Sequence, residues 1–256
     1  MRRRWIADEF SSDRAALTGS HAAHLARVLR AQIGQEFDIS TGEVVRRGRV
    51  ISLSDDRVEF ALGEPVSAVA LPEIAVALAI FKFDRLEWAI EKMTELGVAR
   101  ILPFIAHRTE QKLAAAAKKR VERWRRLALA ASEQSRRASP PEVADPLRLT
   151  DVLSIAAERR ILLAERSLDG ASIPPLIRLL QERTGSVALA IGPEGGWTDA
   201  ELNMFASSGW IATSLGSTIL RAETAAIAAT AIAAAALLEK LNAEDAEESE
   251  AGRTLR

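Results

Sequence analysis

The chain has 256 residues, enough for one large domain or two modest ones, and its 48% hydrophobic and 27% charged residues are those of an ordinary globular protein. It contains no cysteine, which excludes disulfides, zinc–thiolate sites, iron–sulfur clusters and cysteine nucleophiles. The net charge of −1 argues against a protein that binds nucleic acid indiscriminately.

Short β-strands are expected in the N-terminal part of the chain. The candidates are residues 37–40, 44–52 and 58–62, separated by turn residues, with one helical stretch around residues 21–29. This pattern predicts a small β-barrel or sheet.

Strands and helices alternate after residue 72, which predicts a mostly parallel sheet with helices on both faces. The expected strands are 74–81, 100–106, 161–165, 187–191 and 211–215, and the expected helices are 86–96, 112–137, 173–183, 199–208 and an alanine-rich one from residue 225. We therefore expect a β-rich domain over 1–70, an α/β domain over 71–242 and a disordered acidic tail over 243–256.

No targeting or membrane-spanning segment is expected. The basic start is not followed by an apolar region of signal-peptide length, and the longest apolar stretch, 225–238, is shorter than the roughly 20 residues that cross a bilayer. We therefore expect a soluble, cytoplasmic protein that makes no contact with membranes.

A glycine-rich loop follows the predicted strand 187–191. Gly192, Gly195 and Gly196 allow close approach of the backbone to a ligand, and Thr198 with Glu201 predicts a capping box that starts the next helix. The loop lacks the lysine of a phosphate-binding loop, and its glutamate would repel a phosphate. A plain tight turn is the alternative interpretation.

A second unusual loop follows the next strand, 211–215. It contains Arg221 and Glu223 among apolar residues, directly before the alanine-rich helix. The alternative interpretation is an Arg–Glu ion pair with Thr224 as the helix N-cap. Because the carboxyl ends of parallel strands share one edge of the sheet, we expect both loops to form one pocket.

Five ordered segments of the chain resemble one known family. They are IGPEGGW (191–197), LGSTILRAETA (215–225), HLARVLR (24–30), Lys82 with EKMTELGV (91–98), and EQS-x-R (133–137) with Pro140 soon after. They resemble the ribosomal RNA small subunit methyltransferase E (RsmE) family of the SPOUT superfamily, which methylates N3 of a uridine in 16S rRNA.

The resemblance implies a PUA-like β-barrel followed by a SPOUT α/β domain with a deep C-terminal trefoil knot, acting as a homodimer on 16S rRNA or the small ribosomal subunit. It also implies that the knot binds S-adenosyl-L-methionine. The matching cofactor-contacting positions are Gly192, Gly195, Gly196, Leu215, Gly216, Ile219, Leu220 and Thr224. One position departs from the family pattern, since Thr218 stands where the family usually has arginine.

Methylation of uracil N3 requires loss of the N3 proton. Arg221 is the candidate for stabilising negative charge on the uracil carbonyl oxygens. Glu223 is a candidate for orienting Arg221 or accepting the proton, and Glu194 is a weaker candidate for the base. No metal is needed, because the sulfonium of the cofactor is already an activated methyl donor.

Positive charge marks the expected RNA-binding surface. The candidates are Arg2, Arg3, Arg4, Arg27, Arg30 and Arg137, together with the basic helix 112–137, for which a solvated face is an equal alternative. Trp124 in this helix is expected in the core. His21 and His24 have no acidic or histidine partner at metal-ligand spacing nearby, so we expect a helix start and a surface or RNA-facing position rather than a metal site.

Two other functions share these features. A SPOUT enzyme could methylate a ribose 2′-hydroxyl or another base, and a non-catalytic assembly factor could bind RNA alone. The intact glycines and Arg221 favour an enzyme. A phosphate-binding NTPase is disfavoured, because the lysine and the magnesium-binding pattern are missing.

Overall fold

The computed structural model describes residues 4–42, 44–66, 73–168, 172–181 and 185–254, with side chains up to residue 239. The chain forms two compact units. One comprises residues 1–69 and 129–140, and the other comprises residues 70–128 and 141–256. The sequence-based division places residues 129–140 in the second domain, whereas in the structure they pack with the first unit.

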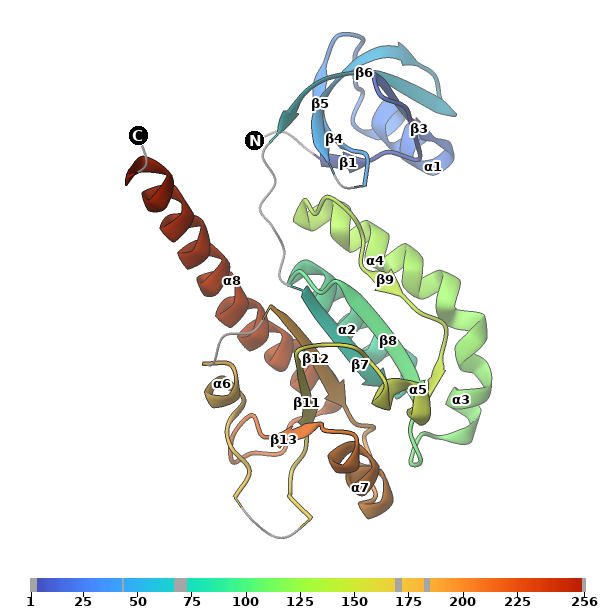
Figure 1. Ribbon diagram of the computed structural model, residues 1–256. Coiled ribbons are helices and arrows are strands. Elements are labelled where there is room, and N and C mark those ends of the chain that lie inside the picture. The colour runs from blue at the N-terminus through green and yellow to red at the C-terminus, as the bar shows by residue number, and fades with distance from the viewer. Residues whose placement is uncertain (1–3, 43, 67–72, 169–171, 182–184, 255–256) are drawn as a thin grey trace. The chain divides into compact units, whose positions relative to one another are not determined.

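The first unit is built on a six-stranded sheet of order β1-β4-β5-β6-β3-β2, antiparallel except for the β1–β4 pair (Figure 1). Its elements are β1 (Arg4–Ile6), β2 (Glu9–Phe10), β3 (Arg14–Thr18), helix α1 (Gly19–Ala23), a π-helical turn (His24–Val28), β4 (Glu36–Ser40), β5 (Val45–Leu53) and β6 (Arg57–Val66). The sequence predicted the helix and the last three strands. It missed β1 to β3 because they are very short or, in β3, contain alanines with little preference for strands.

The core of the first unit lies between this sheet and α1. Trp5, Leu17, Leu25, Ile39 and Phe60 are among its buried side chains. Residues 129–140 join this unit through hydrogen bonds in which the Arg4 guanidinium donates to the Arg136 carbonyl and the Ser40 hydroxyl donates to the Ala138 carbonyl.

The second unit contains a seven-stranded parallel sheet of order β10-β8-β7-β12-β11-β13, with β9 paired to β8. Its strands are β7 (Glu73–Ala79), β8 (Arg100–Ile105), β9 (Glu142–Val143), β10 (Leu147–Arg148), β11 (Arg159–Leu163), β12 (Ser186–Ile191) and β13 (Ile211–Thr213). Its helices are α2 (Phe83–Glu95), α3 (Gln111–Ala117), α4 (Val121–Ser135, whose end belongs to the first unit), α5 (Leu149–Leu153), α6 (Leu176–Leu179), α7 (Asp199–Ser207) and α8 (Ala222–Thr254). The parallel α/β sheet expected from the sequence is therefore present.

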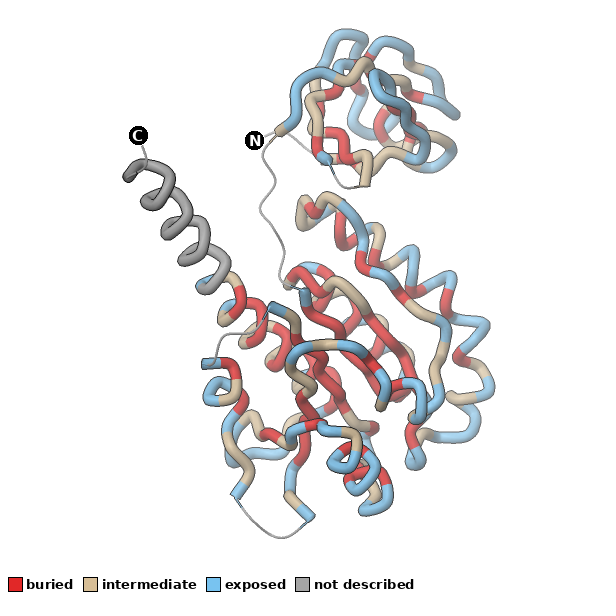
Figure 2. Tube along the Cα trace, in the orientation of Figure 1, coloured by how far each residue is buried: buried red, intermediate tan, exposed pale blue. Residues whose placement is uncertain are grey.

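Alternate residues of β7 pack into the two hydrophobic cores on opposite faces of the sheet. Ile74, Val76 and Leu78 pack with side chains of α2 and α8. The alanines between them pack with the aromatic side chains of Trp197 and Phe205 on the opposite face. The small alanines leave room for these large rings, and Figure 2 shows the central strands buried over most of their length.

Three helices differ from the prediction. The basic helix begins at Gln111, ends at Ser135 and is interrupted by a 3-10 turn (Lys118–Arg120). Helix α6 covers only Leu176–Leu179 of the expected 173–183, because Pro174 and Pro175 lack the backbone donors of a helix interior; part of the expected range lies outside the described residues. Helix α8 continues to Thr254, where we expected a disordered tail, because alanine and glutamate are strong helix formers.

One helix in the described part of the chain is long and apolar enough to cross a membrane by length and composition. The window is Ala222–Glu239, and 44% of it is buried inside the protein. Ala226, Ala229 and Ala233 on its inner face belong to the core of the second unit. The helix is thus a core element of the α/β unit, a kind of helix that passes the same test.

Candidate functional site

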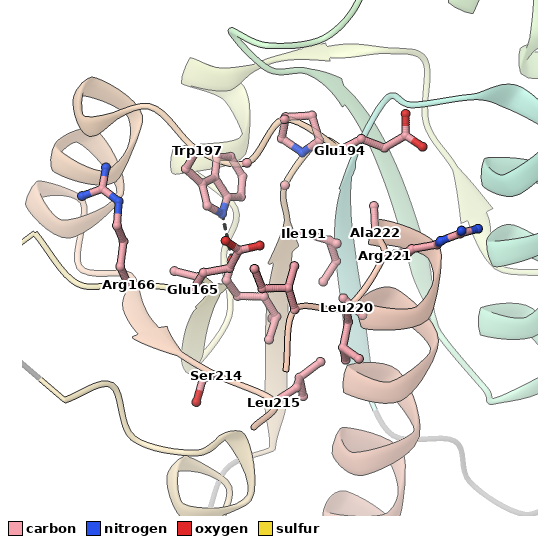
Figure 3. A pocket seen from close by; sticks show the side chains of 18 of the residues that line it. Glu165, Arg166, Ile191, Glu194, Trp197, Ser214, Leu215, Leu220, Arg221 and Ala222 are labelled. Carbon is pink, nitrogen blue, oxygen red and sulfur yellow. Dashed lines mark hydrogen bonds between the residues drawn. The ribbon is translucent and has the colours of Figure 1, made fainter. Parts of the chain in front are cut away.

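The carboxyl ends of β11, β12 and β13 surround a cavity of about 630 Å³, a volume typical of small-molecule sites. Residues 163–166, 191–197 and 213–222 provide most of its lining. Figure 3 shows Ile191, Leu215 and Leu220 around its apolar part. The structure therefore brings the two loops singled out in the sequence into one pocket.

The order of strands at this pocket differs from the expected one. We expected the strands that precede the two loops, β12 and β13, to be neighbours, but β11 lies between them and pairs with both. Consequently Glu165 and Arg166, which follow β11, also line the pocket. These residues were missed, although the rule that applies to the other two strand ends applies equally to β11.

The glycine-rich loop is fixed by Trp197. The indole Nε1 donates a 2.8 Å hydrogen bond to the Leu163 carbonyl, and the ring stacks on Phe104 at 6.1 Å between centroids. A Cβ added to Gly192 would lie 2.9 Å from Cε2 of this indole. Only glycine therefore fits at position 192 without displacing Trp197.

The predicted capping box is confirmed at the start of α7. Thr198 Oγ1 accepts from the Glu201 amide, and the buried Glu201 carboxylate accepts from Thr198 N at 2.9 Å. The other Glu201 oxygen accepts from His107 N at 2.8 Å. This carboxylate thus joins the start of α7 to the loop after β8.

Arg108 holds the outer part of the same loop. Its Nη1 donates a 2.6 Å hydrogen bond to the Gly195 carbonyl, and its side chain lines the pocket. Sequence reasoning missed Arg108, although a basic residue directly after β8 lies at the ligand-binding edge of the sheet.

The second loop combines an anchored start with an exposed rim. Ser214 N donates to the Pro174 carbonyl at 3.1 Å, and the Ser214 carbonyl accepts from Leu176 N at 3.0 Å. Gly216 has a φ of 134°, which a residue with a side chain rarely adopts. The Ile219 side chain is 79% exposed at the pocket rim. An apolar surface is therefore available to a ligand.

Arg85 links the two carboxylates proposed from the sequence. Its Nη1 lies 2.8 Å from Glu194 Oε1, and its Nε lies 3.7 Å from Glu223 Oε1. Glu223 is 5% exposed, and its Oε2 is buried without a hydrogen-bond partner among the described residues. Arg85 was not among the predicted site residues. It lies in the first turn of α2, the helix that follows β7, and β7 is paired with β12.

Arg221 is exposed and lines the pocket. Within the described residues its guanidinium has no ion pair, so the Arg221–Glu223 pair of the alternative interpretation is absent there. Residues two apart at a helix start point in different directions, and Glu223 faces Arg85 instead. The alternative interpretation of Thr224 as a helix N-cap is wrong, because α8 begins two residues earlier at Ala222.

Thr224 lies outside the pocket lining. The other predicted cofactor positions all line it: Gly192, Gly195, Gly196, Leu215, Gly216, Ile219 and Leu220. Thr218, at the position where the resemblance expects arginine, is exposed at the same rim.

The arginines proposed to bind RNA have different surroundings. Arg27 pairs with Asp55 at 2.6 Å, and Arg30 is exposed with a φ of 52°. Arg137 is buried, and this burial lowers the pKa of its guanidinium to about 10, so it does not offer an exposed cation. Arg4 is half-buried, and Arg2 and Arg3 lie outside the described residues.

More of the positive charge of the basic helix is paired with carboxylates than its sequence suggests. Arg125 pairs with Glu122 at 2.6 Å, and Arg123 pairs with Glu87 of α2 at 2.9 Å. Trp124 is fully buried, as predicted. These pairs leave fewer free cations on this helix for phosphate groups.

His21 has two acidic neighbours in the structure. Its Nδ1 lies 3.1 Å from Asp8 Oδ1, and its Nε2 lies 3.8 Å from Glu133 Oε1. These carboxylates are distant in sequence, which is why spacing did not reveal them. No group of three potential metal ligands occurs among the described residues.

The chain is similar to RNA methyltransferases. Residues 69–234 match the family model of the RNA methyltransferase domain. A ribosomal RNA small subunit methyltransferase E from Synechocystis is 34% identical over 84% of this chain and 71% of that protein. A protein of the same name from Mesomycoplasma hyopneumoniae is 34% identical over 60% of this chain, and the match spans 66% of that protein.

A solved structure has a similar fold. It is a ribosomal RNA small subunit methyltransferase E from Neisseria gonorrhoeae bound to S-adenosyl methionine, with 27% identity and a TM-score of 0.75. The similarity covers 90% of this chain and 96% of that one.

Proposed function

We propose that this chain, which belongs to the ribosomal RNA small subunit methyltransferase E family, transfers a methyl group from S-adenosyl-L-methionine to N3 of a uridine in 16S rRNA. The observation that carries this proposal is the pocket formed by the glycine-rich loop and the loop before α8, in a fold that resembles a family member bound to S-adenosyl methionine. The small ribosomal subunit or its RNA is the partner.

The residues of the pocket fit this cofactor. The glycines of the loop 192–196 have no side chains, so the edge of an adenine can approach the loop backbone closely. Ile191, Leu215 and Leu220 offer apolar surface for the ring. When bound, the cofactor supplies an activated methyl group on a sulfonium.

The protein's own residues then prepare the uracil. Arg221 stabilises the negative charge that develops on the uracil carbonyl oxygens when N3 loses its proton. Its exposure at the pocket rim and its lack of an ion pair among the described residues support this role. The candidates for accepting the proton are Glu194 and Glu223. Glu194 lines the pocket, and Oε2 of Glu223 is buried without a hydrogen-bond partner among the described residues.

We also propose a PUA-like barrel for the first unit, a trefoil knot in the second, a homodimer and a cytoplasmic location. Two observations support the knot. The first is that Ser214, in the loop that leads to α8, is hydrogen-bonded to Pro174 and Leu176. The second is that residues before Pro174, 163–166, and residues after Leu176, 213–222, line the same pocket. The curved, mostly antiparallel sheet of the first unit supports the barrel.

A methyl-transfer assay with purified protein tests the function. The substrates are S-adenosyl-L-methionine with a labelled methyl group and either naked 16S rRNA or small subunits from cells that lack the protein. The expected product is 3-methyluridine in digested RNA. A 2′-O-methyl nucleoside or another methylated base would instead favour a different reaction on the same fold, and the absence of label from both substrates would favour an RNA-binding assembly factor.

A further inference from the structure

We infer that Arg85 is a positioning residue of the methyl-transfer site: it binds Glu194 and Glu223, and thereby leaves the Arg221 guanidinium free for the RNA substrate. The inference rests on the proposed function, because that function assigns Arg221 to the uracil. It concerns four charged side chains at the carboxyl edge of one sheet.

These four side chains form an uneven set of ion pairs. Arg85 lies 2.8 Å from Glu194 and 3.7 Å from Glu223, measured between the nearest nitrogen and carboxylate oxygen. Arg221 has no ion pair within the described residues. One guanidinium therefore neutralises both carboxylates, while the other faces solvent at the pocket.

The position of Arg85 is unfavourable for its own helix. It lies in the first turn of α2, where the helix dipole disfavours positive charge. Glu223 is in the first turn of α8, where the dipole favours its negative charge, but it is 5% exposed and needs a cationic neighbour. The Arg85–Glu223 ion pair explains why an arginine lies at the start of α2 and why a glutamate is buried at the start of α8, whereas helix stability alone does not.

Arg221 is the one arginine of the pocket lining whose guanidinium has no hydrogen bond or ion pair among the described residues, so it can take a carboxylate released from Arg85. Arg108 and Arg166, the other arginines that line the pocket, are engaged by the Gly195 carbonyl and by Asp199. Glu194 and Arg221 both line the pocket, and Figure 3 shows their side chains extending to the same side of it. A carboxylate released from Arg85 would therefore compete with the uracil for Arg221.

This competition predicts a defect that a second substitution repairs. Arg85→Met should lower kcat by about tenfold or more, the effect of losing a hydrogen bond between charged groups, and should leave the affinity for S-adenosyl-L-methionine largely unchanged. Arg85→Met with Glu194→Gln, or with Glu223→Gln, removes the negative charge of one carboxylate that captures Arg221. The double variant that keeps the proton-accepting glutamate should recover part of the lost kcat. A merely structural role for Arg85 predicts no recovery.

The test compares steady-state methylation of 16S rRNA by these variants, with cofactor affinity from calorimetry and folding from thermal unfolding. Arg85→Lys keeps the charge and should have an intermediate kcat, which gives a second readout if Arg85→Met folds poorly. Arg100→Met, which removes an exposed pair with Glu142, is the matched control. A wild-type kcat in Arg85→Met, or failure of both double variants to exceed the kcat of Arg85→Met alone, would overturn the inference. Failure of the wild-type protein to methylate the RNA would overturn the proposed function instead.

Discussion

Trp197 Nε1 donates a hydrogen bond to the Leu163 carbonyl, and through this contact the loop after β12 is fixed to the end of the neighbouring strand β11. The same indole occupies the space in which a side chain at position 192 would lie. The shape of the proposed cofactor pocket therefore depends on two residues of one loop, Gly192 and Trp197. The position of Trp197 is in turn fixed by its hydrogen bond to β11.

Gly192→Ala should weaken cofactor binding. The added methyl group would lie 2.9 Å from the indole, so Trp197 or the loop must shift. Such overpacking costs about 1–3 kcal/mol, and we expect a loss of affinity of about tenfold in calorimetry with S-adenosyl-L-methionine. Gly63→Ala is the matched control, because a Cβ there meets its nearest neighbour at 3.4 Å, an ordinary contact. Equal affinities for wild type and Gly192→Ala would contradict the close packing at this site.

Glu201→Gln should destabilise the second unit. The carboxylate accepts from Thr198 N, Thr198 Oγ1 and His107 N, and an amide cannot accept all three because its nitrogen is a donor. The expected loss is about 1–3 kcal/mol in the free energy of unfolding, measured in urea. Glu142→Gln, at an exposed ion pair, should change it by less than about 0.5 kcal/mol. Similar losses in both variants would show that the buried carboxylate has no special role.

Arg221→Ala should lose turnover without losing the cofactor. The guanidinium is proposed to stabilise charge that develops only during the reaction, and removal of such a donor typically costs about 10²–10³ in kcat. Calorimetry should show nearly unchanged affinity for S-adenosyl-L-methionine. If Arg221→Ala retains wild-type kcat, or loses only cofactor affinity, the assignment is wrong.

RNA binding should weaken as salt rises, because arginines displace counterions from phosphates. Arg30 is exposed, so Arg30→Gln should reduce the slope of log affinity against log salt concentration by about one. Arg30→Lys keeps the charge with the same backbone conformation and should preserve the slope. A flat salt response of the wild-type protein would exclude electrostatic docking of the RNA.

Local patterns in the sequence predicted much of the second unit. Apolar strands and the Thr198–Glu201 capping box are both determined by neighbouring residues, and each is present in the structure. The position of β11 between β12 and β13 could not be predicted in the same way, because strand order depends on long-range packing.

The contacts among the charged side chains around the pocket could not be predicted from the sequence either, because they also depend on long-range packing. Arg221, Glu223 and Glu194 were conspicuous because they lie inside unusual loops. Arg85 lies 109 positions before Glu194 and looks like an ordinary helix residue in the sequence. Only the parallel pairing of β7 with β12 brings these elements to the same edge.

Mass spectrometry of 16S rRNA from cells that lack this protein tests the central claim most directly. We predict that 3-methyluridine is present in wild-type rRNA, is lost in the deletion strain, and returns with the wild-type gene but not with a gene encoding Arg221→Ala. An unchanged content of 3-methyluridine in the deletion strain would contradict the assignment.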